Sequence, residues 1–150
     1  MKIETLLKTN SDLALSKKLV LNIIVTANHI SEKVQEAIKP FGISTPQFNV
    51  LRILRGQKGK PANLSTIQER MVSKMSNTTR LVDKLVEKGL SERITCPSNR
   101  RKVEIRITED GLNLLSELDP IIENIENSFI NKLNEKEIET LIIKLNELRS

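Results

Sequence analysis

The feature that most constrains the fold is a pair of helical patterns joined by a tight connection between residues 65 and 89. Ser65–Gln68 has the form of a capping box, which predicts a short helix ending near Met71. Apolar residues three and four apart then predict a longer helix over Lys74–Lys88, with Gly89 placed for a left-handed C-cap. A short helix, a tight turn and a longer helix are typical of a helix-turn-helix.

Two segments with an alternating pattern follow this motif. Leu90–Thr95 alternates weakly and Val103–Ile107 alternates cleanly between apolar and polar residues, which predicts the two strands of a β-hairpin. The residues at or near its tip, Thr95–Lys102, include three consecutive cations. A helix-turn-helix followed by such a hairpin is a winged helix, so we expect residues 41–110 to form a winged helix-turn-helix.

Further helical patterns lie on both sides of the motif. Apolar residues at helical spacing predict a long helix over Ser11–Lys39, and Thr45 followed by Pro46 predicts the N-cap and first position of the next helix. Thr108 and Asn134 are the predicted N-caps of two helices that complete the chain. The expected fold class is mostly α, with a small β-hairpin wing.

The flanking helices are too long and too apolar for one small winged helix to cover. We therefore expect residues 1–40 and 111–150 to pack against each other and against a second copy of the chain. In this hypothesis they form a helical dimerisation region, and the 150 residues make one compact domain overall. A symmetric dimer would present two DNA-reading units, as a palindromic site requires.

The charge distribution favours a polyanionic partner for the first two thirds of the chain. The net charge is +5, yet residues 111–150 carry four basic and eight acidic side chains, so the excess of positive charge lies before them. The chain has no Trp or Tyr and only three Phe, which disfavours single-stranded nucleic acid because such ligands stack on aromatic rings. Duplex DNA is the expected partner.

Other classes of protein are disfavoured. No apolar run has the length of a membrane span, and the opening residues lack the features of a secretory signal, so we expect a cytoplasmic protein. No catalytic set, Gly-rich cofactor loop or cluster of metal ligands is apparent, so we expect no enzyme activity, no cofactor and no metal. The single Cys96 is either a small semi-buried residue or a thiol made reactive by its basic surroundings.

The start of the predicted second helix is rich in short polar side chains and poor in helix formers. Such side chains allow a close approach to base edges and phosphates. The candidate DNA-binding residues here are Ser73, Lys74, Ser76, Asn77, Thr79, Arg80 and Lys84. We expect Lys74, Asn77 and Arg80 to read base edges and the three hydroxyl residues to contact phosphates. Lys84 is either a phosphate contact or a solvated lysine.

The wing supplies the second group of candidates. A wing beside a helix in the major groove lies over the neighbouring minor groove, where negative potential favours arginine. We therefore assign DNA contacts to Arg100, Arg101 and Lys102, and we include the neighbouring Asn99 among the DNA-binding residues of the wing. The alternative is an exposed basic turn without a ligand.

Several of these segments resemble the MarR family of bacterial transcriptional regulators. Thr79–Leu90 is similar to the recognition-helix signature of that family, and Asn99–Arg101 with Ile105–Gly111 is similar to its wing. Pro46–Leu51 resembles its second helix. The similarity in the order of elements extends over nearly the whole chain.

The resemblance implies a homodimer that binds a palindromic operator, usually as a repressor released by a small ligand or by oxidation. It implies that Arg101 is the arginine placed in the minor groove. Asn99 stands where the family has an acid that holds this arginine, and a neutral amide forms a weaker bond. The alternative function is a winged helix used for protein interaction or architecture, without sequence-specific DNA binding.

Overall fold

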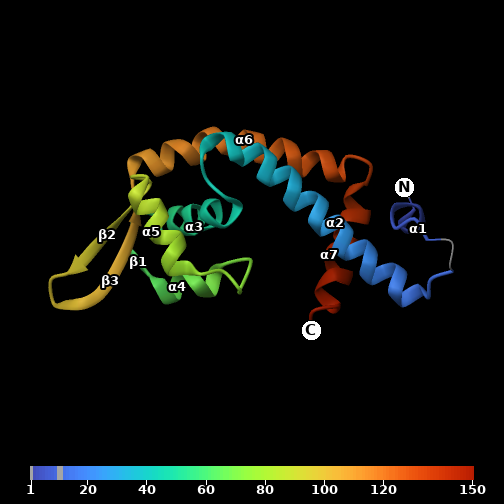
Figure 1. Ribbon diagram of the computed structural model, residues 1–150, viewed down its shortest axis with the longest axis horizontal. Coiled ribbons are helices and arrows are strands. Elements are labelled where there is room, and N and C mark those ends of the chain that lie inside the picture. Colours follow the sequence, from blue (N-terminus) through green and yellow to red (C-terminus); the bar gives the residue numbers. More distant parts are fainter. Residues whose placement is uncertain (1, 10–11) are drawn as a thin grey trace.

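The computed structural model describes residues 2–9 and 12–150, with the side chain of Arg100 excluded. The helices are α1 (Ile3–Leu6), α2 (Leu15–Ile38), the 3-10 turn η1 (Lys39–Phe41), α3 (Thr45–Gly56), α4 (Leu64–Arg70), α5 (Thr78–Glu87), α6 (Glu109–Ile130) and α7 (Glu135–Glu147). The strands are β1 (Ala62–Asn63), β2 (Ser91–Cys96) and β3 (Asn99–Ile107). Figure 1 shows the hairpin and α3–α5 at one end, α1 and α7 at the other, and α6 joining them along one edge.

One hydrophobic core holds the winged end together. It is built from α3, α4, α5, β3 and the first half of α6, and Leu51, Leu85 and Ile105 are among its fully buried members. Leu115 and Leu118 of α6 are also fully buried in this core. The first half of α6 is therefore fixed to the winged body, and its second half extends away from that body toward α7 (Figure 1).

The sheet has three antiparallel strands in the order β1-β3-β2. The predicted hairpin is confirmed as β2 and β3, with Ser91 opposite Ile107. The two-residue β1 was not predicted, because a pair of residues after Pro61 has no alternation to detect. Ala62 pairs with Ile105, so β1 anchors the start of α4 to the wing.

Two predicted helix starts are wrong by one or two residues. The N-cap of α3 is Ser44 rather than Thr45, because Ser44 and Gln47 have the spacing that lets each side chain bond the backbone N–H of the other. The N-cap of α4 is Asn63 rather than Ser65, and its Oδ1 accepts from the Thr66 N–H at 2.8 Å. The predicted caps at Gly89, Thr108 and Asn134 are confirmed.

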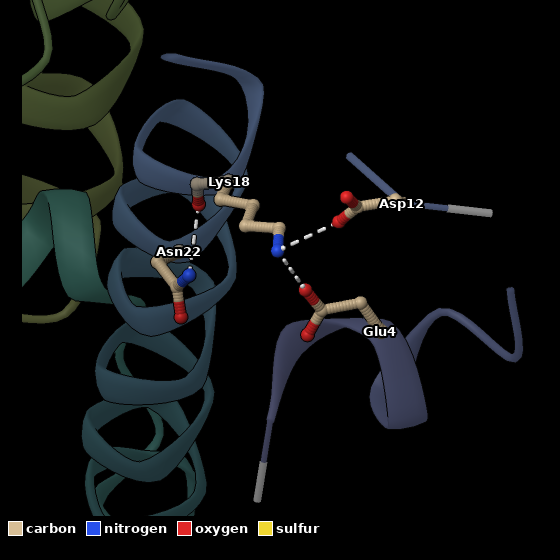
Figure 2. Close-up of polar contacts among 4 residues, drawn as sticks. All are labelled: Glu4, Asp12, Lys18 and Asn22. Atoms are coloured by element: carbon tan, nitrogen blue, oxygen red, sulfur yellow. Dashed lines mark hydrogen bonds and ion pairs between the residues drawn. The ribbon is translucent and has the colours of Figure 1, made fainter. Parts of the chain in front are cut away.

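The N-terminal segment is held against α2 by a small ionic cluster (Figure 2). Lys18 Nζ lies 2.9 Å from a Glu4 carboxylate oxygen and 3.2 Å from one of Asp12. Ile3 is buried beside this cluster. The expected start of the long helix at Ser11 lies outside the described residues, and α2 begins at Leu15.

Within the described residues, none of the helices combines the length and apolar character that crossing a membrane requires. The same part of the chain contains no group of three or more His, Cys, Asp or Glu side chains arranged to hold a metal ion.

Candidate nucleic-acid interface

The second helix of the helix-turn-helix begins four residues later than predicted. α5 starts at Thr78, and Ser73–Asn77 form the turn that precedes it. Asn77 is the N-cap, with its Oδ1 accepting from the Arg80 N–H at 3.1 Å. The polar run fails as a helix because Ser and Asn side chains compete for backbone hydrogen bonds and so favour caps and turns.

Gln68 of α4 fixes the shape of this turn. Its Nε2 donates to the Lys74 carbonyl at 3.0 Å, and its Oε1 accepts from the Thr78 hydroxyl. The Ser76 N–H also donates to the Ser73 carbonyl at 3.3 Å, which closes a tight turn around Lys74 and Met75. The sequence did not indicate this role, because Gln68 also fits a capping box with Ser65, whereas the cap at Asn63 leaves the glutamine side chain free to bond the turn.

The structure distributes the candidate residues of the helix-turn-helix between two elements. Ser73, Lys74 and Ser76 lie in the turn, whereas Thr79, Arg80 and Lys84 lie in α5. The Lys74 ammonium donates to the Glu69 carbonyl at the end of α4. Lys84 forms an ion pair with Glu87 at 2.9 Å.

Arg80 differs from these lysines in its surroundings. It is exposed in the first turn of α5, and its guanidinium forms no ion pair with any described side chain. Arg80 therefore remains available for an anionic partner, whereas the lysines must first release their internal contacts.

The wing presents its cations in an irregular part of the hairpin. Cys96 pairs with Asn99 across the turn, but Thr95 pairs with Val103, so β3 carries three more residues than β2 between these pairs. The residues in this insertion are Arg100, Arg101 and Lys102. Such a bulge bends the strand and redirects its side chains.

Asn99 acts on the backbone of the wing. Its Oδ1 accepts from the Arg101 N–H at 3.1 Å, which is a turn-shaping bond between residues two apart. The Arg101 guanidinium is exposed and forms no ion pair within the part of the chain that the structure describes. Lys102 lies 3.3 Å from a Glu104 carboxylate oxygen, and the side chain of Arg100 lies outside the described residues.

Cys96 lies at the base of the wing turn. Its Sγ is 3.1 Å from the Ser98 hydroxyl, and this hydrogen bond, aided by backbone N–H groups of Ser98 and Asn99, lowers the pKa of the thiol. The residue is partly exposed. The thiol therefore ionises more readily than an ordinary cysteine, through hydrogen bonding rather than through the basic surroundings that the sequence suggested.

The two candidate surfaces both lie at the winged end of the molecule. In Figure 1 the hairpin projects from the outer end of the winged body and the α4–α5 loop lies on the side nearer α2, both below α6. The winged end therefore carries the start of α5 and a basic wing, the two parts by which a winged helix contacts a major groove and the neighbouring minor groove.

Comparison with known proteins agrees with this geometry. The model of the MarR family matches residues 43–103, which cover α3, α4, α5 and most of the wing. The HTH-type transcriptional regulator MhqR of Bacillus subtilis is 30% identical over 125 residues, covering 82% of this chain and 85% of that relative. This chain belongs to the MarR family. It is therefore a DNA-binding transcription regulator.

Solved structures show the same fold over nearly the whole chain. BpsR of Bordetella bronchiseptica, whose DNA binding is regulated by 6-hydroxynicotinic acid, has a TM-score of 0.79 at 22% identity, covering 93% of this chain and 99% of that one. CouR of Rhodococcus jostii, bound to p-coumaroyl-CoA, has a TM-score of 0.77 at 23% identity, covering 91% of this chain and 95% of that one. The MarR fold thus includes the flanking helices as well as the winged body.

Proposed function

We propose that this MarR regulator binds a palindromic operator as a homodimer and represses transcription until a small ligand releases it. Repression needs binding only, so the proposal includes no catalytic step, and a target in cellular DNA assigns the protein to the cytoplasm. The observation that carries the proposal is the separation of two surfaces. Arg80 and Arg101, which form no ion pair with any described side chain, lie at the winged end, and exposed apolar helix faces lie at the other end.

The apolar faces support the homodimer. In α2 only Ile38 is buried, and α7 has no buried residue. The exposed large apolar side chains of these two helices and of the C-cap of α7 are Leu15, Leu19, Val20, Ile23, Ile24, Leu141, Ile142, Ile143 and Leu148. Helices of this character are stabilised by burying their apolar stripes. We therefore assign residues 1–40 and 111–150 to dimerisation and residues 41–110 to DNA binding.

The DNA-binding roles follow from which groups are free. Arg80, at the start of α5, is the proposed base-edge reader, since guanidinium groups recognise guanine through two parallel hydrogen bonds. Arg101, on the wing, is the proposed minor-groove contact. Asn77 already uses its oxygen as a cap, so only its NH₂ group is free to contact DNA. Phosphate contacts are assigned to the hydroxyls of Ser73, Ser76 and Thr79 and, after its ion pair opens, to Lys84.

A hollow where α2 meets α3 is the proposed ligand site. It has a volume of about 570 Å³ and is lined by Ser31, Glu32, Gln35, Glu36, Lys39, Thr45 and Pro46. Across it, the Gln35 side-chain oxygen accepts from both the N–H and the hydroxyl of Thr45 at 3.0 Å. A ligand that displaces these bonds would change how the winged body is held on the dimerisation helices. BpsR, whose DNA binding is regulated by 6-hydroxynicotinic acid, and CouR, which is bound to p-coumaroyl-CoA, motivate this part of the proposal.

The decisive experiment is a selection from random duplex DNA with the purified protein, followed by sequencing of the retained molecules. The expected result is an inverted repeat whose half-sites lie about one helical turn apart. A specific regulator should bind the selected site on the order of 10³-fold or more tightly than random DNA at the same salt concentration. Bulk, salt-sensitive binding without enrichment would overturn the proposal and favour an interaction or architectural module.

A further inference from the structure

The turn before α5 exposes two apolar side chains on the proposed DNA-binding face. Met75 is 95% exposed and Val72 is 86% exposed. These are the two most exposed of the large apolar residues on the winged body. Removing an apolar side chain from water is favourable, so a partner that covers these residues beside the recognition helix would gain binding free energy.

We infer that Met75 contacts the C5-methyl group of a thymine in the major groove and so contributes a thymine preference to each operator half-site. The inference rests on the proposed function, since it requires sequence-specific binding by this face. Among the groups at the major-groove edges of the four bases, the thymine methyl is the apolar one. Duplex DNA is favoured over a protein partner because the apolar pair is continuous with the proposed DNA interface at Arg80.

The local structure presents Met75 in a defined place. The residue lies in the tight turn closed by the Ser76 N–H and the Ser73 carbonyl, and Gln68 bonds the carbonyl of the preceding Lys74. Gln68 also accepts from Thr78 at the start of α5, so one side chain joins α4, the turn and the recognition helix. The backbone at Met75 is therefore ordered before DNA arrives, which reduces the entropy lost on binding.

The polar neighbours of Met75 are less available for base recognition. Lys74 donates to the Glu69 carbonyl, and Asn77 caps α5 with its side-chain oxygen. The Lys74 ammonium and the Asn77 side-chain oxygen are therefore engaged inside the protein, and a contact from Met75 adds to sequence discrimination at this end of α5. Methionine suits the role because its unbranched, polarisable side chain adapts to an irregular surface.

The test uses the full-length protein and the site obtained by selection. Each thymine of one half-site, and its symmetry mate, is replaced by uracil, which removes only the C5-methyl group. Burial of one methyl group changes affinity by about fourfold, so we expect the wild type to lose about fourfold per half-site at one thymine. Met75→Ala should bind the thymine site more weakly than the wild type does, by the same factor, and should bind the uracil site no more weakly than the thymine site. Met75→Leu should still lose most of the affinity that the wild type loses when uracil replaces thymine.

Val72→Ala is the matched control, since it trims an equally exposed apolar side chain in the same loop. The Val72→Ala variant should lose as much affinity as the wild type when uracil replaces the thymine that Met75 contacts. The inference is overturned if no uracil substitution weakens the wild type, if Met75→Ala retains the full uracil effect, or if Val72→Ala removes the same effect. Absence of any selected site would instead overturn the proposed function and the inference with it. Circular dichroism melts should show the same midpoint for all variants, because the mutated side chains make little contact with the fold.

Discussion

Arg101 is the wing residue on which the proposed minor-groove contact depends. Its guanidinium is exposed and unpaired with any acid among the described residues, while its backbone is fixed by Asn99 at 3.1 Å. The side chain can therefore enter a minor groove without first breaking an internal ion pair. The hydrogen bond to Asn99 fixes the backbone of Arg101 and not its guanidinium. The negative potential of the DNA must therefore orient the guanidinium.

Replacing Arg101 by alanine should weaken binding to the selected operator by about 1–3 kcal/mol, the usual size of one specific contact. Fluorescence anisotropy with labelled duplex at a fixed salt concentration measures this change. Arg149→Ala near the C-terminus is the control, since it removes the same charge far from the wing and should have little effect. Equal affinity of the Arg101→Ala variant and the wild type would mean that the wing lies outside the groove.

Asn77 has two candidate roles, which conservative replacements can separate. As the N-cap of α5 it accepts from Arg80, so Asn77→Ala should lower the free energy of unfolding by about 1 kcal/mol. Asn77→Ser should restore most of this stability because serine also caps helices. Urea denaturation of both variants measures the difference.

The same pair of variants tests base recognition by the Asn77 NH₂ group. If that group reads a base, Asn77→Ser should bind the operator more weakly than the wild type although its stability is restored. Wild-type affinity of Asn77→Ser would limit Asn77 to the capping role and leave Arg80 as the polar reader at this end of α5.

At the scale of elements, helix periodicity and strong caps were sufficient to predict most of the fold. The stripes of α2, α6 and α7 and the alternation of β3 depend on local spacing, so the sequence contains them directly. The start of α5 was misplaced because the mostly polar residues 73–77 suit both a helix and a turn. The turn is selected by the Gln68 side chain, which bonds both Lys74 and Thr78. The two-residue β1 exists only through its pairing with β3.

The candidate site was predictable in composition but not in geometry. Sequence alone indicated the polar run before α5 and the cations of the wing. It could not indicate that Lys74 and Lys84 have internal partners, that Asn99 bonds backbone rather than guanidinium, or that three cations occupy an insertion in β3. Each of these depends on positions of backbone and side chains that only the fold defines.

The attachment of α1 to α2 should depend on pH at both extremes. The hydrogen bond and charge of Lys18 lower the pKa of Glu4, and the bond from Glu4, with that from Asp12, raises the pKa of Lys18. The carboxylate contribution is present above the ordinary Glu pKa and is lost as pH falls through the lowered value. The ammonium contribution is present below the ordinary Lys pKa and is lost as pH rises through the raised value.

Amide hydrogen exchange of α1 measures this attachment locally. Protection at residues 3–7 should be greatest between the two pKa values and should fall on either side of them. Lys18→Ala should abolish the pH dependence, whereas Lys33→Ala, which removes the partner of Glu36 in the same helix, should preserve it. Protection that is unchanged by Lys18→Ala would mean that the burial of Ile3 alone holds the segment.

At the scale of the whole molecule, the two ends depend on each other for operator binding. A single winged body contacts one half-site, and joining two bodies makes the second contact intramolecular, which raises affinity without any new interaction. In Figure 1 α7 and the first part of α2 lie far from the wing, and these segments carry the exposed apolar side chains, so a change there affects DNA binding only through assembly. This separation allows dimerisation and DNA contact to be tested independently.

Ile142, which is 53% exposed on α7, is the residue chosen for that test. Ile142→Glu should convert the dimer to a monomer, because an ionised carboxylate in an apolar interface has no partner to offset its lost hydration. Sedimentation velocity should report half the mass of the wild-type dimer. Affinity for a full palindrome should then fall to that for an isolated half-site. Leu112→Glu introduces the same charge at an exposed position near the start of α6, at the end of the 111–150 region that adjoins the winged body, and should leave the mass unchanged. A dimeric Ile142→Glu protein with full operator affinity would show that this face of α7 is not the dimer interface.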